Sequence, residues 1–504
     1  MTPAGNTRRS FRLEVVSETD EWDLVVIGGG TAGLVAGRTA ASFGAQAVLI
    51  EAHRLGGDCL WTGCVPSKSL IAAADAAKTA RSSGPLGVSA RDVVVDFAEV
   101  MTHVQDAMDI IAPVDSAESL ERDNIEVLNG RARFTGPNTV EVNGTNLRFR
   151  QALIATGATP TVPDIPGIDA VDVLTSETLW NLRTLPERLV VLGGGAIGCE
   201  IAQAMARLGS HVTLVQRGPR ILPKEDARAS ALIEAALIAD GVDVRTNCTV
   251  ASVTSTDRLA GTFTLSDGTT LSFDRALAAL GRRSNTADLG LEHVGVRRDQ
   301  RGNIVVDTKL RSSNPRIWAA GDVTGMPQFT HTAGVNASVA ATNAILGLTR
   351  SVDTVAIPRV TFTHPEVGAV GLQAQDAQQS RHRIISREHE HVDRAVTEAQ
   401  TAGYTQLVVD KRGRVLGGTV VGPRAGETLG EISLAVKNRL TTSQIAGTTH
   451  AYPTYNDGLW NVAVADVRHR LDSGPIQIAM RALRQLRNAR LRHRPTPWIQ
   501  RRKR

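Results

Sequence analysis

The chain of 504 residues contains only four cysteines: Cys59, Cys64, Cys199 and Cys248. So few cysteines exclude the disulfide framework of a small secreted protein and favour a reducing compartment. Aromatic residues make up only 4% of the chain, but 42% hydrophobic and 21% charged residues are typical of an ordinary soluble protein. No uninterrupted apolar run is long enough to span a bilayer, and residues 1–20 lack the apolar centre of a signal peptide. We therefore expect a cytoplasmic protein.

The net charge of +5 is concentrated at the C-terminal end. Residues 468–504 hold 12 arginines and lysines and one acidic residue. The remaining residues, 1–467, hold 44 basic and 50 acidic residues and therefore have a net charge of −6. Within this basic tail, one helical stripe would consist of Ile476, Ala479, Met480, Leu483 and Leu486, with arginines on the other side. A basic amphipathic helix can touch an anionic membrane or, non-specifically, nucleic acid. It can equally pack on its own dimer.

Residues 23–51 have the pattern of a strand, a tight turn, a helix and a second strand. In that turn, Gly28, Gly30 and Gly33 satisfy G-x-G-x-x-G. The first glycine permits the turn, the second lets the backbone approach a diphosphate, and the third allows close helix–strand packing. Free N–H groups at the start of the helix would face the diphosphate, and Glu51, ending the second strand, can bind a ribose hydroxyl. The pattern predicts a dinucleotide site.

The same pattern returns in residues 189–217, with glycines at Gly193, Gly195 and Gly198. Here Gln216 stands where an acid would bind the 2′-hydroxyl of NAD, and Arg217 and Arg220 follow. Arginine offers charge-assisted hydrogen bonds to a 2′-phosphate, which favours NADPH, with NADH still possible. The alternative is that both arginines lie on a solvated surface turn.

Residues 56–68, GGDCLWTGCVPSK, place two cysteines close together shortly after the first glycine motif. Cys59 and Cys64 at this spacing can close a small disulfide loop. A dithiol beside a redox cofactor can accept the electron pair of a hydride and pass it on by thiol–disulfide exchange. The alternative is two buried free cysteines, which behave as small core residues.

Together these patterns resemble the pyridine nucleotide-disulfide oxidoreductases, which bind FAD first and NAD(P) second along the chain. The resemblance covers about residues 20–465. It also extends to the segments LIATG at 153–157, IWAAGD at 317–322 and VTFTHPEVGAVGL at 360–372. Further cofactor-binding residues implied by it are Thr156, Gly157, Gly281, Gly321 and Asp322. In the family, the aspartate contacts the ribityl side of the flavin, and the helix that follows directs its N-terminus toward the isoalloxazine ring.

The resemblance also implies roles at the dithiol. Cys64 would be the flavin-facing thiol and Cys59 the interchange thiol that attacks substrate. Lys68 would contact the flavin and pair with Glu200; the alternative is an ordinary surface pair. Asp58 departs from the threonine often found before the first cysteine, and an adjacent acid is expected to raise a thiol pKa.

The largest departure lies in residues 450–457, HAYPTYND. The family places a histidine before Pro-Thr, supported by a glutamate, and this pair serves the dithiol of the partner subunit. Tyr452 occupies the histidine position and Asp457 the glutamate position. Tyrosine, with an unperturbed pKa near ~10, is a poor base at neutral pH. His450 would share a face with Tyr452 in an extended strand, so it either substitutes or is a non-catalytic histidine.

We therefore expect an α/β protein with two Rossmann-like dinucleotide-binding domains and an α+β interface domain for dimerisation. The predicted divisions are a polar arm (1–20), the first FAD part (21–165), an NAD(P) domain (166–288), the second FAD part (289–355), the interface domain (356–470) and the basic tail (471–504).

The expected activity is transfer of electrons from NADPH through FAD and the Cys59–Cys64 disulfide to a small electrophile: a disulfide, a quinone or a metal ion. The protein would be a homodimer with a shared active site and no resident metal. Tyr452 and the segment PQF at 327–329 resemble mercuric-reductase-like proteins, but no cysteine follows Cys248. The alternatives are a lipoamide dehydrogenase that uses NAD and His450, or a redox-silent flavoprotein that docks through its basic tail.

Overall fold

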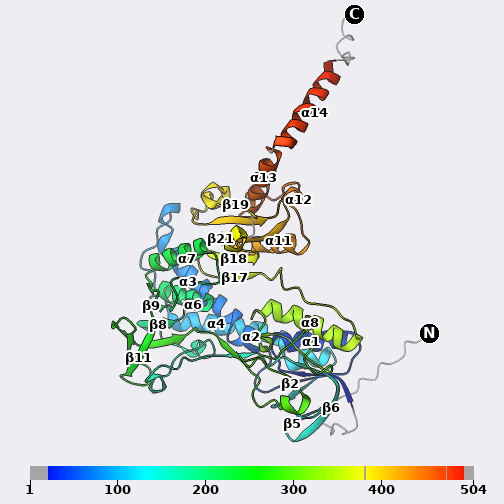
Figure 1. The fold of residues 1–504 in the computed structure, drawn as a ribbon. Helices are drawn as coiled ribbons and strands as arrows, with labels where there is room; N and C mark the ends of the chain where they lie inside the picture. The colour runs from blue at the N-terminus through cyan, green and yellow to red at the C-terminus, as the bar shows by residue number, and fades with distance from the viewer. Residues whose placement is uncertain (1–20, 380–381, 473, 493–504) are drawn as a thin grey trace, which may run out of the picture. The chain divides into compact units, whose positions relative to one another are not determined.

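The computed structural model describes residues 21–379, 382–472 and 474–492. The predicted N-terminal arm and residues 493–504 of the basic tail lie outside these ranges. The chain forms two compact units (Figure 1): unit 1 comprises Met1–Pro223 and Leu237–Asp353, and unit 2 comprises Lys224–Ala236 and Thr354–Arg504. No helix in the described ranges is both long enough and apolar enough to cross a bilayer.

Unit 1 contains a seven-stranded sheet in the order β3-β2-β1-β6-β5-β4, with β16 also paired to β6. Its strands are β1 (Glu21–Ile27), β2 (Ala47–Glu51), β3 (Ile125–Asn129), β4 (Arg133–Gly136), β5 (Thr139–Val142), β6 (Thr145–Ile154) and β16 (Ile317–Ala319). The central strand β1 pairs in parallel with β2 and β6. Its residues Leu24–Ile27 are almost fully buried, as expected for a parallel strand covered on both faces.

Helices α1 (Thr31–Ser42) and α8 (Thr330–Leu346) pack against each other and share one buried core with this sheet. The other sheet face packs on a second core, which includes Phe134 and Phe149. Unit 1 also contains α2 (Gly57–Trp61), α3 (Cys64–Ser82), α4 (Phe97–Ile111) and α5 (Ala117–Arg122). The first dinucleotide pattern is therefore built into the centre of this sheet.

The second glycine pattern lies in a four-stranded parallel sheet of unit 1, in the order β10-β9-β8-β14. Its strands are β8 (Arg188–Leu192), β9 (His211–Val215), β10 (Asp243–Arg245) and β14 (Arg275–Ala278), and α6 (Ala196–Leu208) follows β8. The antiparallel strands β11 (Val250–Ser255), β12 (Gly261–Leu265) and β13 (Thr270–Phe273) form a separate sheet, and β7 (Ala158–Pro160) pairs with β15 (Arg282–Ser284).

Unit 2 contains a five-stranded antiparallel sheet in the order β17-β18-β21-β20-β19. The strands are β17 (Arg359–Thr361), β18 (Glu366–Gly371), β19 (Arg383–Glu388), β20 (Tyr404–Val409) and β21 (Val415–Gly422). Most of α7 (Ala227–Ala239) also belongs to this unit. Its further helices include α9 (Ala374–Gln379), α10 (Asp393–Thr397), α11 (Ala425–Lys437), α12 (Thr442–Ala446) and α13 (Asp457–Leu471). The expected α/β class, with dinucleotide-binding sheets and an α+β region, is confirmed.

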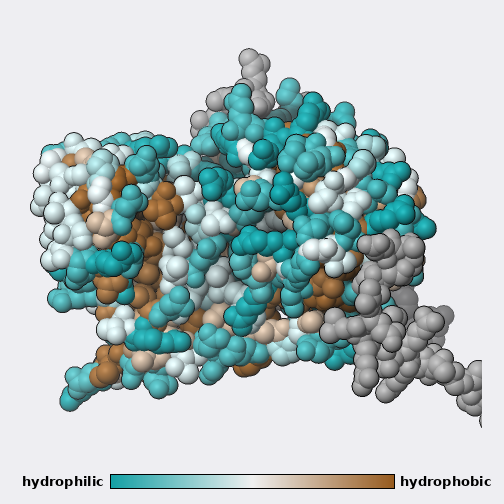
Figure 2. All heavy atoms as spheres, turned by 90° about the horizontal axis from the view of Figure 1, so that it is seen from below, coloured by the Kyte–Doolittle hydropathy of each residue, from teal (hydrophilic) through white to brown (hydrophobic). Residues whose placement is uncertain are grey.

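The predicted basic helix is α14 (Gly474–Arg492), the red helix in Figure 1. Its apolar side chains are exposed, with Leu483 at 66% and Leu486 at 58%. One detail of the expectation is wrong: Arg487 and Arg490 lie four residues after these leucines, and residues four apart share a helix face. The arginines therefore wind across the apolar stripe instead of covering only the opposite side. Elsewhere, the face shown in Figure 2 is mainly hydrophilic around smaller hydrophobic areas.

Candidate active site

The first glycine turn leaves the N-terminus of α1 open. Gly28 has φ +107°, a left-handed conformation that glycine adopts without strain. A Cβ at Gly33 would lie 1.8 Å from the Gly28 carbonyl oxygen, so only glycine permits this helix–turn packing. The N-cap residue Gly30 offers no side-chain cap to the first N–H groups of α1. Those donors and the positive end of the helix fit the diphosphate of a dinucleotide.

Glu51 ends β2 beside this turn. Its Oε2 accepts a hydrogen bond of 2.6 Å from the Gly29 N–H, and its Oε1 accepts one of 2.7 Å from the His53 N–H. These bonds fix the carboxylate at the mouth of the glycine turn. Glu51 is thus fixed beside the first glycine turn, at the end of β2.

The second glycine turn repeats this arrangement with an amide in place of the acid. Gly195 caps α6 without a side-chain bond, and a Cβ built on it would meet nothing within 4 Å. Gln216 follows β9, and its Oε1 accepts a 2.9 Å hydrogen bond from the Gly194 N–H. Gln216 therefore holds the position that Glu51 holds in the first unit, without a negative charge. Gly193 and Gly198 pack together like Gly28 and Gly33.

The two arginines after Gln216 differ in their surroundings. Arg217 is exposed. Arg220 donates through Nη2 to the Pro223 carbonyl, at 3.2 Å. Its Nη1 is buried and has no hydrogen-bond partner within the described part of the chain. A buried guanidinium nitrogen with an unused donor is suited to an anionic ligand group.

The dithiol is formed by α2 and the first residue of α3. Both Cys59 and Cys64 are free thiols. The hydrogen bond between them lowers the pKa of Cys64 to about 6, and Thr330 and Lys68 act in the same direction. The same hydrogen bond, with burial, raises the pKa of Cys59. These opposite shifts favour Cys64 as the thiolate of the pair and Cys59 as the protonated thiol.

Two further elements face Cys64. The Cys64 sulfur and Thr330 Oγ1, at the start of α8, are hydrogen-bonded at 3.3 Å. The N-cap of α8 has no side-chain bond, so the positive end of this helix also favours a thiolate. From α3, Lys68 Nζ donates to Glu200 Oε2 of α6 at 2.8 Å. Glu200 is buried at 6% exposure, so the pair is no ordinary surface contact.

Asp58 is turned toward an arginine that the sequence reasoning did not single out. Nη2 of Arg282 donates to Asp58 Oδ2, and Nε of Arg282 lies 3.5 Å from Asp322 Oδ2. The sequence predicts that Asp58 raises the pKa of its neighbouring thiol. The pKa of Cys59 is raised by its hydrogen bond to Cys64 and by burial, and Asp58 is not among the causes. Burial raises the pKa of Asp322.

The remaining predicted flavin residues lie around the β7–β15 pair and β16. Thr156 Oγ1 donates to the Asn285 carbonyl at 2.6 Å. Gly157 and Gly281 both have positive φ, and a Cβ on either would meet nothing within 4 Å. Gly321, also with positive φ, directly precedes Asp322. Space is therefore open beside Gly157 and Gly281, whereas a Cβ at Gly321 would lie 3.2 Å from the Cβ of Ala32.

The C-terminal segment differs from the expectation. Residues 450–452 form no strand, so the argument that His450 and Tyr452 share a strand face is wrong. His450 Nε2 is hydrogen-bonded to Glu431 Oε1 at 2.9 Å, and its side chain is 9% exposed. Tyr452 is 68% exposed, and its hydroxyl donates to Asp393.

The acid paired with Tyr452 is therefore Asp393 of α10, and not Asp457. The Asp457 carboxylate instead accepts a 3.2 Å hydrogen bond from Asn461 within α13. The bond to Asp393 raises the pKa of Tyr452, and burial raises that of Asp457. No sequence signal identified Asp393 or Glu431, since neither belongs to the motif around Pro453.

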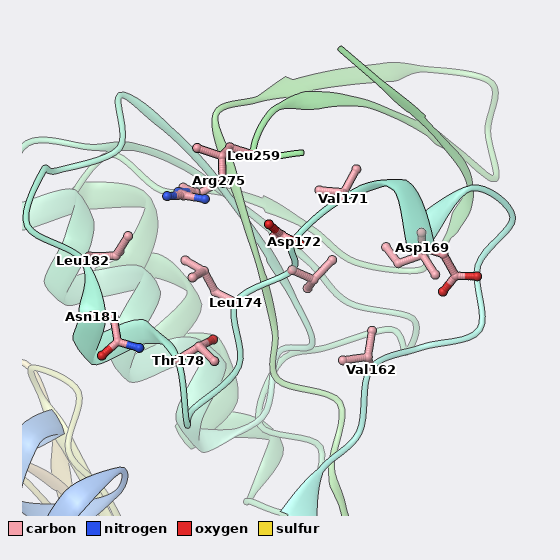
Figure 3. Close-up of a pocket in the computed structure, with 12 residues that line it drawn as sticks. Val162, Asp169, Val171, Asp172, Leu174, Thr178, Asn181, Leu182, Leu259 and Arg275 are labelled. Atoms are coloured by element: carbon pink, nitrogen blue, oxygen red, sulfur yellow. The ribbon is translucent and has the colours of Figure 1, made fainter. Parts of the chain in front are cut away.

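A separate cavity of about 660 Å³ lies in unit 1 (Figure 3). Aliphatic side chains line most of it, and its charged lining residues are Asp169, Asp172 and Arg275. It includes none of the predicted site residues. The glycine turns and the dithiol therefore define the candidate site independently of this cavity.

Two family models match the chain. The pyridine nucleotide-disulphide oxidoreductase model matches residues 22–337, and the dimerisation domain of that family matches residues 357–463. A mercuric reductase from Lysinibacillus sphaericus is 34% identical over 463 residues, covering 90% of this chain and 85% of the relative. A dihydrolipoyl dehydrogenase from Geobacillus stearothermophilus is 36% identical over 447 residues, covering 87% and 94%.

Two solved structures share the fold. LpdA from Mycobacterium tuberculosis has a TM-score of 0.82 at 28% identity, covering 89% of this chain and 100% of that chain. The HOCl-induced flavoprotein disulfide reductase RclA from Escherichia coli, as a Cu(II) complex, has a TM-score of 0.80 at 28% identity, covering 88% and 99%. The open glycine turns and the paired thiols agree with these matches. The chain belongs to the pyridine nucleotide-disulphide oxidoreductases, enzymes that use FAD and NAD(P)H.

Proposed function

We propose that this enzyme takes electrons from NADPH and reduces a small electrophile through the Cys59–Cys64 disulfide. The observation that carries the proposal is the setting of Cys64, whose sulfur is hydrogen-bonded to Thr330 Oγ1 at the N-terminus of α8 and is stabilised as a thiolate by Lys68. The pKa of Cys64 is lowered to about 6 whereas that of Cys59 is raised. One thiol is thus set to be a thiolate beside the cofactor, and the other stays protonated until it attacks substrate.

FAD, when bound, supplies the two-electron chemistry that links the nicotinamide to the disulfide. Gly28, Gly30 and Glu51 would hold its diphosphate and ribose, as their open backbone and fixed carboxylate allow. Lys68 lowers the pKa of Cys64 electrostatically. Once the disulfide is reduced, Cys64 keeps its negative charge and Cys59 keeps the proton, which separates the cofactor-side role from the substrate-side role.

NADPH is the proposed donor because Gln216 removes the acid that would repel a 2′-phosphate. The unused Arg220 Nη1 supports the same proposal. Kinetics with NADPH and NADH at equal concentration test it directly. A clear preference for NADH would contradict it.

Two candidate functions differ in the electron acceptor that the enzyme reduces. Relatives named mercuric reductase and dihydrolipoyl dehydrogenase match at similar identity, so neither name decides the substrate. Tyr452 in place of a histidine favours an acceptor that needs no strong general base, such as a quinone or a metal ion. The second candidate, a dihydrolipoyl dehydrogenase, is supported by the His450–Glu431 pair, which could orient an imidazole. The redox-silent docking role is not compatible with membership of an enzyme family.

The deciding experiment is a panel of acceptors with the purified holoenzyme: lipoamide, low-molecular-weight disulfides, a quinone and mercuric ion. We expect quinone or metal reduction to exceed lipoamide reduction. Fast lipoamide reduction with NADH would instead support the second candidate.

Three partner and location proposals accompany this function. The match to the dimerisation domain supports a homodimer. We propose that its active site is shared between the subunits. We also propose that the exposed α14 contacts an anionic membrane or nucleic acid. Co-sedimentation with anionic vesicles or with DNA tests this contact, and the variant Arg484→Gln/Arg487→Gln should bind less. A cytoplasmic location remains a prediction from the low cysteine content.

A further inference from the structure

Asp58 joins the dithiol turn to a distant part of unit 1. It directly precedes Cys59 in α2, and its Oδ2 accepts a hydrogen bond from Arg282 Nη2. Its Oδ1 lies 3.4 Å from Thr62 Oγ1, inside the same turn. Arg282 is the first residue of β15 and comes directly after Gly281. The ion pair therefore ties the turn that carries both thiols to the antiparallel strand pair β7–β15.

Arg282 is held from a second side. Its Nε lies 3.5 Å from Asp322 Oδ2, and its Nη2 also donates to the Ala158 carbonyl. The arginine side chain is 15% exposed and that of Asp322 is 22% exposed. The Nη2 hydrogen bonds to Asp58 and to the Ala158 carbonyl hold the guanidinium, and Nε contacts Asp322 only as an ion pair, without a hydrogen bond.

The charges around Cys64 come from several elements. Cys59 in α2, Lys68 in α3 and Glu200 in α6 each affect its pKa, and Thr330 of α8 is hydrogen-bonded to it. Cys64 and Asp58 both raise the pKa of Asp322, whereas Arg282 lowers it. Glu177 is a third carboxylate in this region, and its pKa is raised by burial and by Asp58 and lowered by Arg282. Arg282 therefore adds a positive charge close to the carboxylates of Asp58, Asp322 and Glu177.

We propose that Asp58 and Arg282 are positioning residues that hold the dithiol turn against Asp322 and balance the charge beside Cys64. The proposal rests on the dithiol function proposed above and assigns a role to an acid where threonine is often found. Arg282 alone would leave an excess positive charge beside the thiolate, and Asp58 alone would leave an excess negative one. As a pair they fix the turn at nearly constant local charge.

A solvent-exposed ion pair in the same unit provides a comparison. Arg258 and Asp172 are also ion-paired, but their side chains are 72% and 49% exposed. Such pairs are screened by water and contribute little. Arg282, in contrast, is enclosed and touches three groups from different parts of the chain. The Arg258–Asp172 pair therefore provides the matched control.

The test compares five proteins: wild type, Asp58→Asn, Arg282→Met, the double variant and the control Asp172→Asn/Arg258→Met. Each holoenzyme is reduced to its dithiol state, and the long-wavelength charge-transfer absorbance is titrated against pH. FAD content is measured for each. The rate of alkylation of the thiols by iodoacetamide is followed over the same pH range as a readout that needs no bound flavin.

Removing the Asp58 charge leaves Arg282 to stabilise the thiolate, so the midpoint pH should fall by about one unit. Removing Arg282 leaves the carboxylates and should raise it by about as much. The double variant should return close to wild type, and the control should not change. Equal midpoints in wild type and Asp58→Asn would overturn the proposal, even if Arg282→Met fails to bind FAD. If wild type shows no charge-transfer band at all, the proposed dithiol function itself is wrong.

Discussion

Lys68 Nζ lies 2.8 Å from Glu200 Oε2, joining the helix that begins at Cys64 to the helix of the second glycine unit. The lysine lowers the pKa of Cys64 and the glutamate raises it. The pair therefore adjusts the thiolate from one side while Asp58 and Arg282 are proposed to do so from another.

Lys68→Met should raise the pKa of Cys64, because it removes a cation that stabilises the thiolate. The pKa of about 6 means that the thiolate is present above that pH and lost below it. We expect the thiolate to appear only at higher pH in the variant, as measured by absorbance at 240 nm or by alkylation rate. Glu200→Gln is the companion variant and should shift the titration the opposite way. Identical titrations would show that Lys68 does not act on Cys64.

Cys64→Ser should abolish the long-wavelength charge-transfer band and leave FAD bound, because Glu51 and the glycine turn hold the cofactor independently of the thiol. Cys59→Ser should retain a stable Cys64 thiolate and strengthen the band. Visible spectra of the two purified variants provide the measurement. The reverse pattern would exchange the two roles.

Replacing Arg217 and Arg220 with alanine should raise the KM for NADPH more than the KM for NADH, since the arginines are proposed to bind the 2′-phosphate. Gln216→Glu should act in the same direction by adding repulsion. Steady-state kinetics with both nucleotides measure the change. Equal effects on the two would place the arginines outside the nucleotide site.

Tyr452→His should increase disulfide reduction, because it restores a group able to protonate the leaving thiolate. General acid–base assistance is typically worth about 10²–10⁴-fold. Quinone reduction should stay nearly unchanged. Asp393→Asn, which removes the hydrogen-bond partner of Tyr452, serves as the control for local disturbance. If wild type already turns over lipoamide rapidly and His450→Ala removes that activity, His450 is the acid–base group.

Asp466→Ala should destabilise unit 2. The Asp466 carboxylate is 0% exposed and is ion-paired with Arg383 at 2.5 Å and with Arg470 at 3.0 Å. Removing one partner of a fully buried ion pair costs about 3–5 kcal/mol. The cost here should lie below that range, because the remaining Arg383 and Arg470 side chains are 31% and 24% exposed and reach water. Thermal unfolding measures the loss. Asp172→Ala, at an exposed pair, should change the Tm little, and a similar change in both would contradict the argument.

The sequence alone determined the family and the local parts of the site. Each glycine turn depends on residues within six positions of one another, and the two cysteines are five positions apart. The chain itself brings such residues together, since a strand–turn–helix unit has one local geometry. The second nucleotide unit, the dithiol and the α/β class could therefore be recognised without coordinates.

The tertiary structure decided which side chains face these local parts. Arg282 meets Asp58 across 224 positions, and Tyr452 finds Asp393 across 59. No spacing rule predicts such pairs, because they depend on how separate elements pack and which charges burial forces together. For the same reason the sequence suggested that Asp58 acts on its neighbouring thiol, whereas packing directs its carboxylate to an arginine from β15.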